Sequence, residues 1–399
     1  MKILVVHNRY YYRGGEDTVV DAEVMLLREH GHEVQIYHRE NLELSRISKG
    51  RAALDTIWSQ QTVTDINHIN SSFTPDVIHA HNTFPLISPS LYGVAKKLRV
   101  PVVQTLHNFR LLCPQAMLLR EGRVCEDCVG HLPWRAVVHR CYRNSYSQSA
   151  VSTFMLATHR MLGTWRNKVN RYIVLNQTCR DKFKKCGLPL ERLRIKPNFV
   201  ESKRTPVWNQ RKGGMFIGRL AAEKGVMILA QAVATLPGRS IDVYGKGPLQ
   251  TLVEQSPGLR YCGFHSPSAL ANRLHQATYL VMPSTGVESF GLVAIEAFAC
   301  GTAVIATNHG GLAELIVHGK TGLFVRPGDV WALAQTIAWA EANPAAMIKM
   351  GQAARAEYLS RYTPEHNYEI LTGIYREAVA DMYTIKTDGI DYAENRISR

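Results

Sequence analysis

The chain alternates short apolar runs with segments of helical periodicity, and this alternation occurs twice along its 399 residues. In the first half we predict strands at five runs: Lys2–Val6, Val34–Tyr37, Asp76–His79, Val100–Leu106 and Tyr172–Leu175. The intervals between these runs are long enough for crossover helices. Fully apolar strands joined in this way are typical of a parallel sheet with helices on both faces.

The pattern restarts after a polar stretch containing Pro and paired Gly, between Lys196 and Gly214. Further strands are predicted at Met215–Ile217, Ile241–Tyr244, Tyr279–Met282, Ala303–Ala306 and Leu323–Val325. We therefore expect an α/β chain of two Rossmann-like, doubly wound domains, 1–200 and 201–375, facing a cleft. Residues 376–399 are expected to hold the end of a closing helix, Pro364 to about Tyr383, and a polar tail, Lys386–Arg399. Ligands of such sheets bind at the carboxyl ends of the strands.

The composition suits two large cores, because 46% of the residues are hydrophobic and 20% are charged. These values exclude wholesale disorder and a collagen-like chain. No apolar run approaches the roughly 18 residues that cross a bilayer, and the apolar part of the N-terminus is too short for a secretory signal. We therefore expect a cytoplasmic chain.

The net charge of +14 lies mainly in residues 1–200, which hold 28 Lys and Arg against 16 Asp and Glu. No acidic residue occurs between Cys128 and Asp181, whereas this stretch contains Arg135, Arg140, Arg143, Arg160, Arg166, Lys168, Arg171 and Arg180. Large apolar side chains are interleaved with them: Trp134, Tyr142, Phe154, Met155, Leu156, Met161, Leu162 and Trp165. Segment 134–171 thus suits an anionic membrane surface on the inner face of the plasma membrane. The alternative is a helix packed on the sheet with a solvated basic face.

Four of the eight cysteines, Cys113, Cys125, Cys128 and Cys141, have C-x11-C-x2-C-x12-C spacing in an expected insertion at about 108–145. In a reducing compartment this pattern favours a structural zinc site of four thiolates. Reduced core thiols and a disulfide pair are the alternatives. A site closed by four thiolates leaves no position for substrate, so no catalytic cofactor is expected.

The segment after the Tyr279–Met282 run combines a loop carboxylate with a predicted helix start. Glu288 lies in the loop, and Ser289, Phe290, Gly291 and Leu292 precede Glu296 inside the helix. Free backbone N–H groups at a helix start bind anions such as a diphosphate. Glu296, among apolar neighbours, needs a partner, and a ribose hydroxyl would supply one. The alternative is an exposed helix with two ordinary glutamates.

Two cations follow the Met215–Ile217 run in the sequence Gly218-Arg219-Leu220-Ala221-Ala222-Glu223-Lys224-Gly225. Arg219 and Lys224 could stabilise the charge of a departing diphosphate, a role that a divalent metal has in other enzymes. This predicts a donor site without a metal. The alternative is a solvated surface pair.

In the first domain, Gly14 and Gly15 lie in the first strand-to-helix loop, where the backbone can approach a ligand closely. A tight turn without a function explains them equally well. Glu16 and Asp17, beside them, are candidates for contact with an acceptor.

The E-x7-E spacing of Glu288 and Glu296, the G-R-L-x-x-x-K-G segment and the stretch from Asn308 to Leu323 together resemble the retaining GT-B glycosyltransferases of family 4 (group 1 type). The resemblance implies transfer of a sugar with retention from a UDP- or GDP-sugar to a glycan or lipid-linked acceptor, as in the synthesis of bacterial surface polysaccharides. It assigns catalytic roles to His107, Glu288, Arg219 and Lys224, and His107 matches the family histidine that contacts the donor sugar. The donor would also contact Gly14, Gly15, the 289–292 stretch and Glu296.

Two other functions stay open at this stage. A sugar-nucleotide epimerase with paired α/β domains would convert the donor without an acceptor. A basic nucleic-acid-binding protein would explain the charge, but no nucleic-acid module is visible in the sequence, so we expect no nucleic-acid partner.

Overall fold

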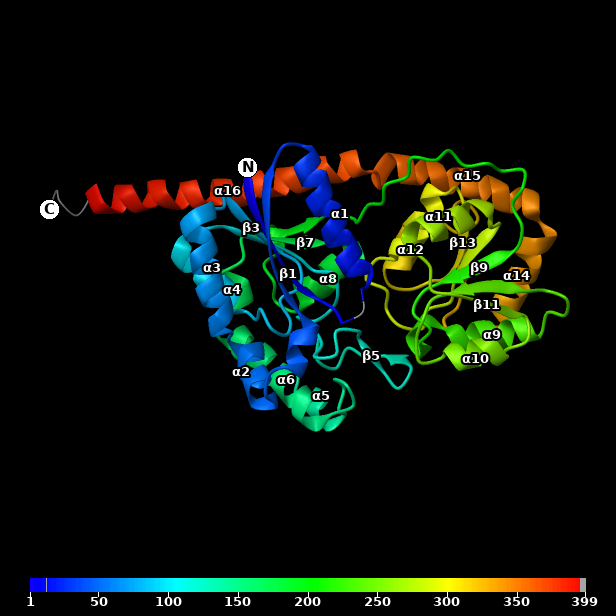
Figure 1. Cartoon of the computed structure of the whole chain (residues 1–399), viewed down its shortest axis with the longest axis horizontal. Helices are drawn as coiled ribbons and strands as arrows, with labels where there is room; N and C mark the ends of the chain where they lie inside the picture. The colour runs from blue at the N-terminus through cyan, green and yellow to red at the C-terminus, as the bar shows by residue number, and fades with distance from the viewer. Residues whose placement is uncertain (12, 395–399) are drawn as a thin grey trace. The chain divides into compact units, whose positions relative to one another are not determined.

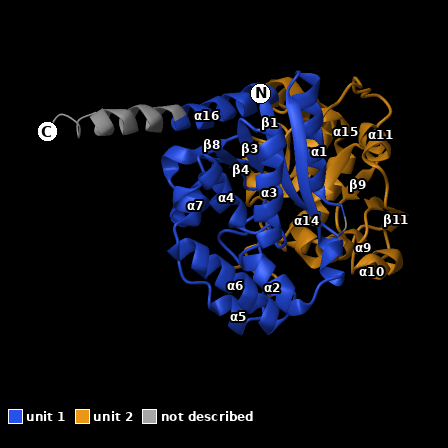
Figure 2. Ribbon diagram, turned by 60° about the vertical axis from the view of Figure 1, so that its left-hand side comes forward, with its two compact units in different colours: residues 1–116, 127–196, 368–399 blue, residues 117–126, 197–367 orange. Residues whose placement is uncertain are grey.

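The computed structural model describes residues 1–11 and 13–394, with the backbone alone for 383–394. The chain forms two compact units, coloured separately in Figure 2. Unit 1 consists of Met1–Ala116, Asp127–Lys196 and the chain from Tyr368 on, and unit 2 of Met117–Glu126 and Pro197–Asn367. Each unit is built around a six-stranded parallel sheet.

The sheet of unit 1 has the strand order β2-β1-β3-β4-β7-β8. Its strands are β1 (Lys2–Arg9), β2 (Glu33–Glu40), β3 (Val77–Ala80), β4 (Val102–Thr105), β7 (Arg171–Val174) and β8 (Leu193–Ile195). The main helices of this unit are labelled in Figure 1, except for α7, which Figure 2 labels: α1 (Gly15–Glu29), α2 (Lys49–Ile57), α3 (Gln60–Phe73), α4 (Ser90–Leu98), α5 (Arg135–Val138), α6 (Tyr146–Met161), α7 (Thr164–Asn167) and α8 (Gln177–Lys185).

The sheet of unit 2 has the order β11-β10-β9-β12-β13-β14. Its strands are β9 (Gly214–Ile217), β10 (Ile241–Tyr244), β11 (Leu259–Gly263), β12 (Tyr279–Met282), β13 (Ala303–Thr307) and β14 (Gly322–Val325). Its helices are α9 (Val226–Ala234), α10 (Gln250–Gln255), α11 (Pro267–Gln276), α12 (Leu292–Ala299), α13 (Gly311–Leu315), α14 (Val330–Ala342) and α15 (Pro344–Arg361).

Both sheets reverse their strand order next to the first strand of the unit. In unit 1 the chain moves from β1 outward to β2 and then returns to place β3 on the other side of β1. In unit 2 the chain likewise moves from β9 outward to β10 and β11, and then returns to place β12 on the other side of β9. Helices that leave the two central strands in opposite directions open a crevice at the carboxyl ends of those strands, where ligands bind. The loops after β1, β3, β9 and β12 are therefore the first places to look for a site.

The predicted fold class of two doubly wound α/β domains is confirmed, and each predicted strand run overlaps an observed strand. Two strands of the six-stranded sheets were missed, β8 and β11. Both lie at a sheet edge, and residues such as Arg194 and Arg260 interrupt their apolar pattern. An edge strand needs less apolar surface, so its periodicity is weaker. The predicted cleft between the domains stays a prediction.

The last helix, α16 (Pro364–Glu394), begins in unit 2 and joins unit 1 from Tyr368 on. Its buried residues Leu371, Ile374, Tyr375 and Ala378 pack in one cluster with side chains of β1 and α1. Their spacing of three and four residues places them on one helix face. The closing helix thus extends past Tyr383, into the expected tail, and residues 395–399 of that tail lie outside the described residues.

The expected insertion at 108–145 contains a short hairpin, β5 (Leu119–Arg120) and β6 (Arg123–Val124), followed by α5. Residues 117–126, which include the hairpin, belong to unit 2, although the sequence suggested that the whole insertion belongs to the first domain. Among the described residues, no helix is both long enough and apolar enough to cross a bilayer.

The packing of α16 on unit 1 can be tested at Leu371, which is fully buried. Leu371→Ala removes apolar contacts with the sheet and should lower the free energy of unfolding by about 2–5 kcal/mol. The unfolding midpoint in urea, followed by circular dichroism, measures this change. Glu369→Ala, at an exposed position of the same helix, is the control and should leave the midpoint unchanged. Equal midpoints for the two variants would contradict the packing.

Candidate active site

In unit 2 the loops after β9 and β12 meet through their backbones. Gly225 has a φ of +73°, and a Cβ at this position would lie 1.9 Å from the carbonyl oxygen of Pro283. The amides of Thr285 and Gly286 each donate a hydrogen bond of 3.0 Å to the carbonyl of Glu223. Only glycine permits this approach at residue 225, so the two loops form one surface at the strand reversal.

A partly buried ion pair joins the same two loops. The ammonium of Lys224 lies 2.6 Å from Oε1 of Glu288, and the hydroxyl of Ser284 donates to this same oxygen at 2.7 Å. Burial alone would raise the pKa of Glu288, but the charge of Lys224 and the two hydrogen bonds outweigh burial and lower that pKa below its ordinary value. Glu288 is therefore ionised at neutral pH.

The second predicted cation, Arg219, forms an ion pair with Glu223 one turn further along the same loop. Its side chain is 57% exposed, whereas that of Lys224 is 31% exposed. The structure thus brings Arg219 and Lys224 into one loop, each with a carboxylate partner. Sequence analysis did not foresee these pairings.

The helix start predicted near Gly291 is present. Gly291 is the N-cap of α12, with a φ of +105°, and a Cβ there would lie 2.6 Å from Cδ2 of Leu312. The first N–H groups of a helix have no partner within the helix. Here these are the amides of Leu292 and Val293, because the amide of Ala294 donates to the carbonyl of Gly291 at 2.9 Å. Phe290 is buried, with its ring 6.2 Å from that of Tyr362, so its side chain supports the loop.

Glu296 lies in the following turn of α12 and is partly buried. Burial raises its pKa to about 7. Within the described chain no hydrogen bond or ion pair compensates this carboxylate, which is costly to ionise away from water. The side chain therefore has unused capacity for a ligand with hydrogen-bond donors.

In unit 1, Gly14 and Gly15 form the start of α1, and Gly14 is the N-cap. The amide of Gly14 donates to Oδ2 of Asp17 at 2.8 Å, and Oδ1 of Asp17 lies 2.9 Å from Nε2 of His7. Burial would raise the pKa of Asp17, but the bonds from His7 and Gly14 outweigh it and lower that pKa. One oxygen of Asp17 thus stabilises the helix start, and the other joins α1 to His7 on β1.

Glu16, the other candidate for contact with an acceptor, accepts hydrogen bonds at Oε2 from the hydroxyl of Tyr10 at 2.8 Å and the amide of Asn108 at 3.3 Å. Its Oε1 is buried and has no hydrogen-bond partner within the described residues. Burial raises the pKa of Glu16. Glu16 therefore links the loop after β1 to Asn108, the residue after His107.

His107 follows β4 and is 9% exposed. Its Nε2 lies 2.9 Å from Nδ1 of His81, which follows β3. Burial, together with nearby cationic groups, lowers the pKa of His107 well below its ordinary value. Three further charged or titratable residues near His81 were missed by sequence analysis: Glu23, His79 and the fully buried Lys196. The His-Ala-His spacing at the end of β3 was the available sequence signal.

Of the four cysteines predicted to bind zinc, Cys113 and Cys128 are buried, and Cys125 and Cys141 are partly buried. Cys125 belongs to unit 2, whereas the other three belong to unit 1. Across the described residues, the one group of three or more His, Cys, Asp and Glu side chains gathered as for a metal is Glu23, His79 and His81. The zinc site at the cysteines stays a prediction.

Two family models match the chain. The model for Glycosyltransferase Family 4 matches residues 13–204, and the model for Glycosyl transferases group 1 matches residues 202–357. The second match contains the loops after β9 and β12 and the whole of α12.

Among curated relatives, a glycogen synthase of Mycobacterium tuberculosis is 29% identical over 307 residues, which are 73% of this chain and 66% of that protein. A D-inositol 3-phosphate glycosyltransferase of Mycobacterium avium is 34% identical over 187 residues, 44% of each chain. The chain thus matches just under two thirds of the length of the first relative and less than half of the second.

Solved structures with the same fold include a sucrose-phosphate synthase from Thermosynechococcus elongatus, with a TM-score of 0.73 at 20% identity over 95% of this chain and 99% of that one. The Anabaena protein HepE, solved in complex with UDP-glucose, has a TM-score of 0.64 at 17% identity, covering 94% of this chain and 99% of HepE. The likeness to these structures shows the GT-B fold. The two adjoining family matches, which together extend over residues 13–357, identify the chain as a member of the group 1, family 4 glycosyltransferases.

Proposed function

We propose that the protein is a retaining hexosyltransferase that moves a sugar from a UDP- or GDP-sugar to a glycan or lipid-linked acceptor, in the synthesis of bacterial surface polysaccharide. The observation that carries this proposal is the surface of unit 2 at the β9–β12 reversal. There the Lys224–Glu288 pair, the first turn of α12 and the uncompensated Glu296 lie on adjoining segments. A cation, free N–H groups and a carboxylate are the groups that a nucleoside diphosphate needs.

In this proposal the N–H groups at the start of α12 and the ammonium of Lys224 hold the diphosphate, and Arg219 adds a second cation. Glu296 accepts hydrogen bonds from the ribose hydroxyls. Glu288, whose Oε1 is already bonded to Lys224 and Ser284, orients the sugar together with His107. Gly14 and Gly15 are candidates for contact with the donor, and Glu16 is the candidate for contact with the acceptor.

The proposed reaction needs no protein nucleophile. The acceptor hydroxyl attacks the anomeric carbon on the face that the diphosphate leaves, so that one C–O bond forms as the other breaks. The proton of the hydroxyl passes to an oxygen of the departing phosphate. Catalysis then rests on positioning and on stabilisation of the charge that develops on the phosphate.

The matches support glycosyl transfer over the rival functions. Both family models describe glycosyltransferases, and the relatives are named glycogen synthase and D-inositol 3-phosphate glycosyltransferase. An epimerase would convert the donor without an acceptor. Product analysis with a panel of nucleotide sugars, with and without acceptor glycans, separates the two reactions, and conversion that needs no acceptor would contradict the proposal.

Single substitutions test the donor site. Lys224→Ala and Glu296→Ala should each lower kcat/KM for the donor at least tenfold, or about 1.4 kcal/mol of transition-state stabilisation. Steady-state kinetics over a range of donor concentrations measure the loss. Lys349→Ala and Glu254→Ala, at exposed positions of α15 and α10, are controls of the same residue types. Near-normal kinetics of both site variants would contradict the assignment.

The raised pKa of Glu296 predicts that donor binding depends on pH. A carboxylate with a pKa of about 7 is mostly protonated at pH 6 and mostly ionised at pH 8. Since the ionised form is the better acceptor for ribose hydroxyls, affinity for a nucleotide sugar should rise roughly tenfold from pH 6 to pH 8. Calorimetric titrations measure this rise. Glu296→Gln should abolish the dependence, and an unchanged pH profile in this variant would assign the titration to another group.

We also propose that the surface around α5 and α6 binds an anionic membrane. The predicted segment divides in the structure, because Met155, Leu156 and Trp165 are buried in unit 1. Tyr142 is partly buried. Other apolar residues of the segment are more than half exposed, as is Leu132 just before it: Trp134, Val138, Tyr146, Phe154, Met161 and Leu162. Arg135 and Arg140 lie over the rings of Trp134 and Tyr146. Cations beside exposed aromatic rings favour a surface of anionic headgroups.

Vesicle binding tests this surface. The wild-type protein should sediment with vesicles that contain phosphatidylglycerol and not with pure phosphatidylcholine vesicles, and salt should weaken the binding. Replacing Arg135, Arg140 and Arg143 by Ala should abolish sedimentation while donor hydrolysis persists. Full activity on a water-soluble acceptor without any vesicle binding would contradict a membrane-bound acceptor.

A further inference from the structure

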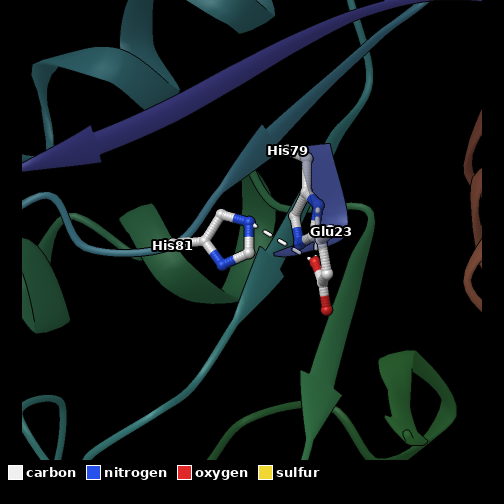
Figure 3. A group of neighbouring side chains, drawn as sticks. All are labelled: Glu23, His79 and His81. Carbon is white, nitrogen blue, oxygen red and sulfur yellow. Dashed lines mark ion pairs between the residues drawn. The ribbon is translucent and has the colours of Figure 1, made fainter. Parts of the chain in front are cut away.

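A chain of buried polar side chains lies in unit 1 beneath His107. It consists of Glu23 on α1, His79 on β3, His81 after β3, and Lys196 after β8, and we call it the buried histidine chain. Its members are between 0% and 4% exposed. Figure 3 shows Glu23, His79 and His81 close together. Buried ionisable groups are costly, so this arrangement requires an explanation.

A metal ion is one candidate, because one ligand atom from each of Glu23, His79 and His81 lies within 4.8 Å of the others. The ammonium of Lys196, however, lies 2.5 Å from Oε1 of Glu23 and already supplies the positive charge that this carboxylate needs. Both ring nitrogens of His79 also have partners. Its Nε2 lies 2.8 Å from the hydroxyl of Thr105, and its Nδ1 lies 2.7 Å from the hydroxyl of Tyr375. The group is therefore already compensated without a metal.

The contact between His81 and Glu23 decides where the proton of His81 lies. Nε2 of His81 is 3.6 Å from Oε2 of Glu23, and both atoms are buried with no hydrogen-bond partner among the described residues. A ring nitrogen with a lone pair would repel the carboxylate, whereas an N–H group is attracted to it. Burial keeps His81 neutral by lowering its pKa well below the ordinary value. A neutral imidazole carries one proton, so Nδ1 is an acceptor.

The position of this proton determines the tautomer of the next ring. Nδ1 of His81 lies 2.9 Å from Nε2 of His107, and the planes of the two rings differ by 14°. N–H groups and lone pairs of imidazole lie in the ring plane, so near-parallel planes suit a hydrogen bond. Because His81 accepts at Nδ1, His107 must donate from Nε2.

We propose that the Glu23–Lys196 ion pair, acting through His81, holds His107 as the tautomer with its proton on Nε2 and a hydrogen-bond acceptor at Nδ1. Glu23, Lys196 and His81 are then positioning residues. If His107 contacts the donor sugar, a role that rests on the proposed function, its Nδ1 accepts a hydrogen bond from a sugar hydroxyl. The enzyme would then favour donors that carry a hydroxyl at that position. The tautomer itself does not depend on the reaction.

Nitrogen NMR of the full chain labelled with ¹⁵N-histidine tests the tautomer directly, because protonated and unprotonated ring nitrogens resonate far apart. His107→Gln and His81→Asn spectra assign the two rings. In the wild type we expect protonated Nε2 and unprotonated Nδ1 for both His81 and His107. Protonation of His107 at Nδ1 would overturn the proposal. Coordination of added Zn²⁺ by His79 and His81 in the same spectra would also overturn it, in favour of a metal site.

Kinetics test the positioning role. His81→Leu removes the acceptor and should lower kcat/KM about tenfold or more, with mixed tautomers of His107 in the spectrum. His81→Asn places an amide oxygen near the former Nδ1 and should restore most of the activity and the Nε2 tautomer. Tyr375→Phe is a control next to the buried histidine chain. It removes the hydroxyl that lies 2.7 Å from Nδ1 of His79, and it should leave the His107 tautomer unchanged. Thermal unfolding of each variant separates positioning from loss of the fold.

The outcomes separate this proposal from the proposed function. A protein that binds no nucleotide sugar would refute glycosyl transfer, while the wild-type spectrum would still decide the tautomer. An active enzyme with unchanged kcat/KM in His81→Leu would overturn the positioning role and leave glycosyl transfer intact.

Discussion

The ion pair between Lys224 and Glu288 is the contact on which the candidate donor site depends. It joins residues 64 positions apart, and it forms because the loops after β9 and β12 share one edge of the sheet. The strand reversal brings these loops together, and Gly225 lets their backbones touch. The candidate donor site therefore depends on the fold, since a side chain at residue 225 would push the two loops apart.

The two units use buried charge in different ways. In unit 1, Lys196 and Glu23 are fully buried, and His81 lies between Glu23 and His107, 3.6 Å from the first and 2.9 Å from the second. In unit 2, Lys224 and Arg219 are partly exposed, and their partners are carboxylates that a phosphate could displace. Buried pairs resist exchange because either charge alone would be left in a medium of low polarity. The buried pair of unit 1 is therefore suited to hold an ionisable group in one protonation state. The cations of unit 2 are suited to exchange a carboxylate partner for a ligand.

The sequence was informative where structure is local. Each central strand was recognisable as an apolar run, and Glu288 and Glu296 were visible because only seven residues of one loop and helix separate them. The edge strands β8 and β11 lacked that signal. The pairing of Lys196 with Glu23 spans 173 residues, so neither residue could be distinguished from an ordinary surface charge in the sequence. The sequence likewise does not show which unit most of α16 joins. This depends on which core Leu371 and Tyr375 pack against, and the periodicity of the helix does not specify that core.

The pairings in unit 2 also change how donor affinity should be understood. Arg219 and Lys224 suggested from the sequence a site with two unopposed positive charges, but Glu223 and Glu288 balance them. A diphosphate would meet a site of almost no net charge, so simple attraction gives little affinity. The directional groups then decide the binding: the N–H groups at the start of α12, and an ammonium that can turn from a carboxylate to a phosphate. Such a site would recognise the shape of the ligand more than its charge.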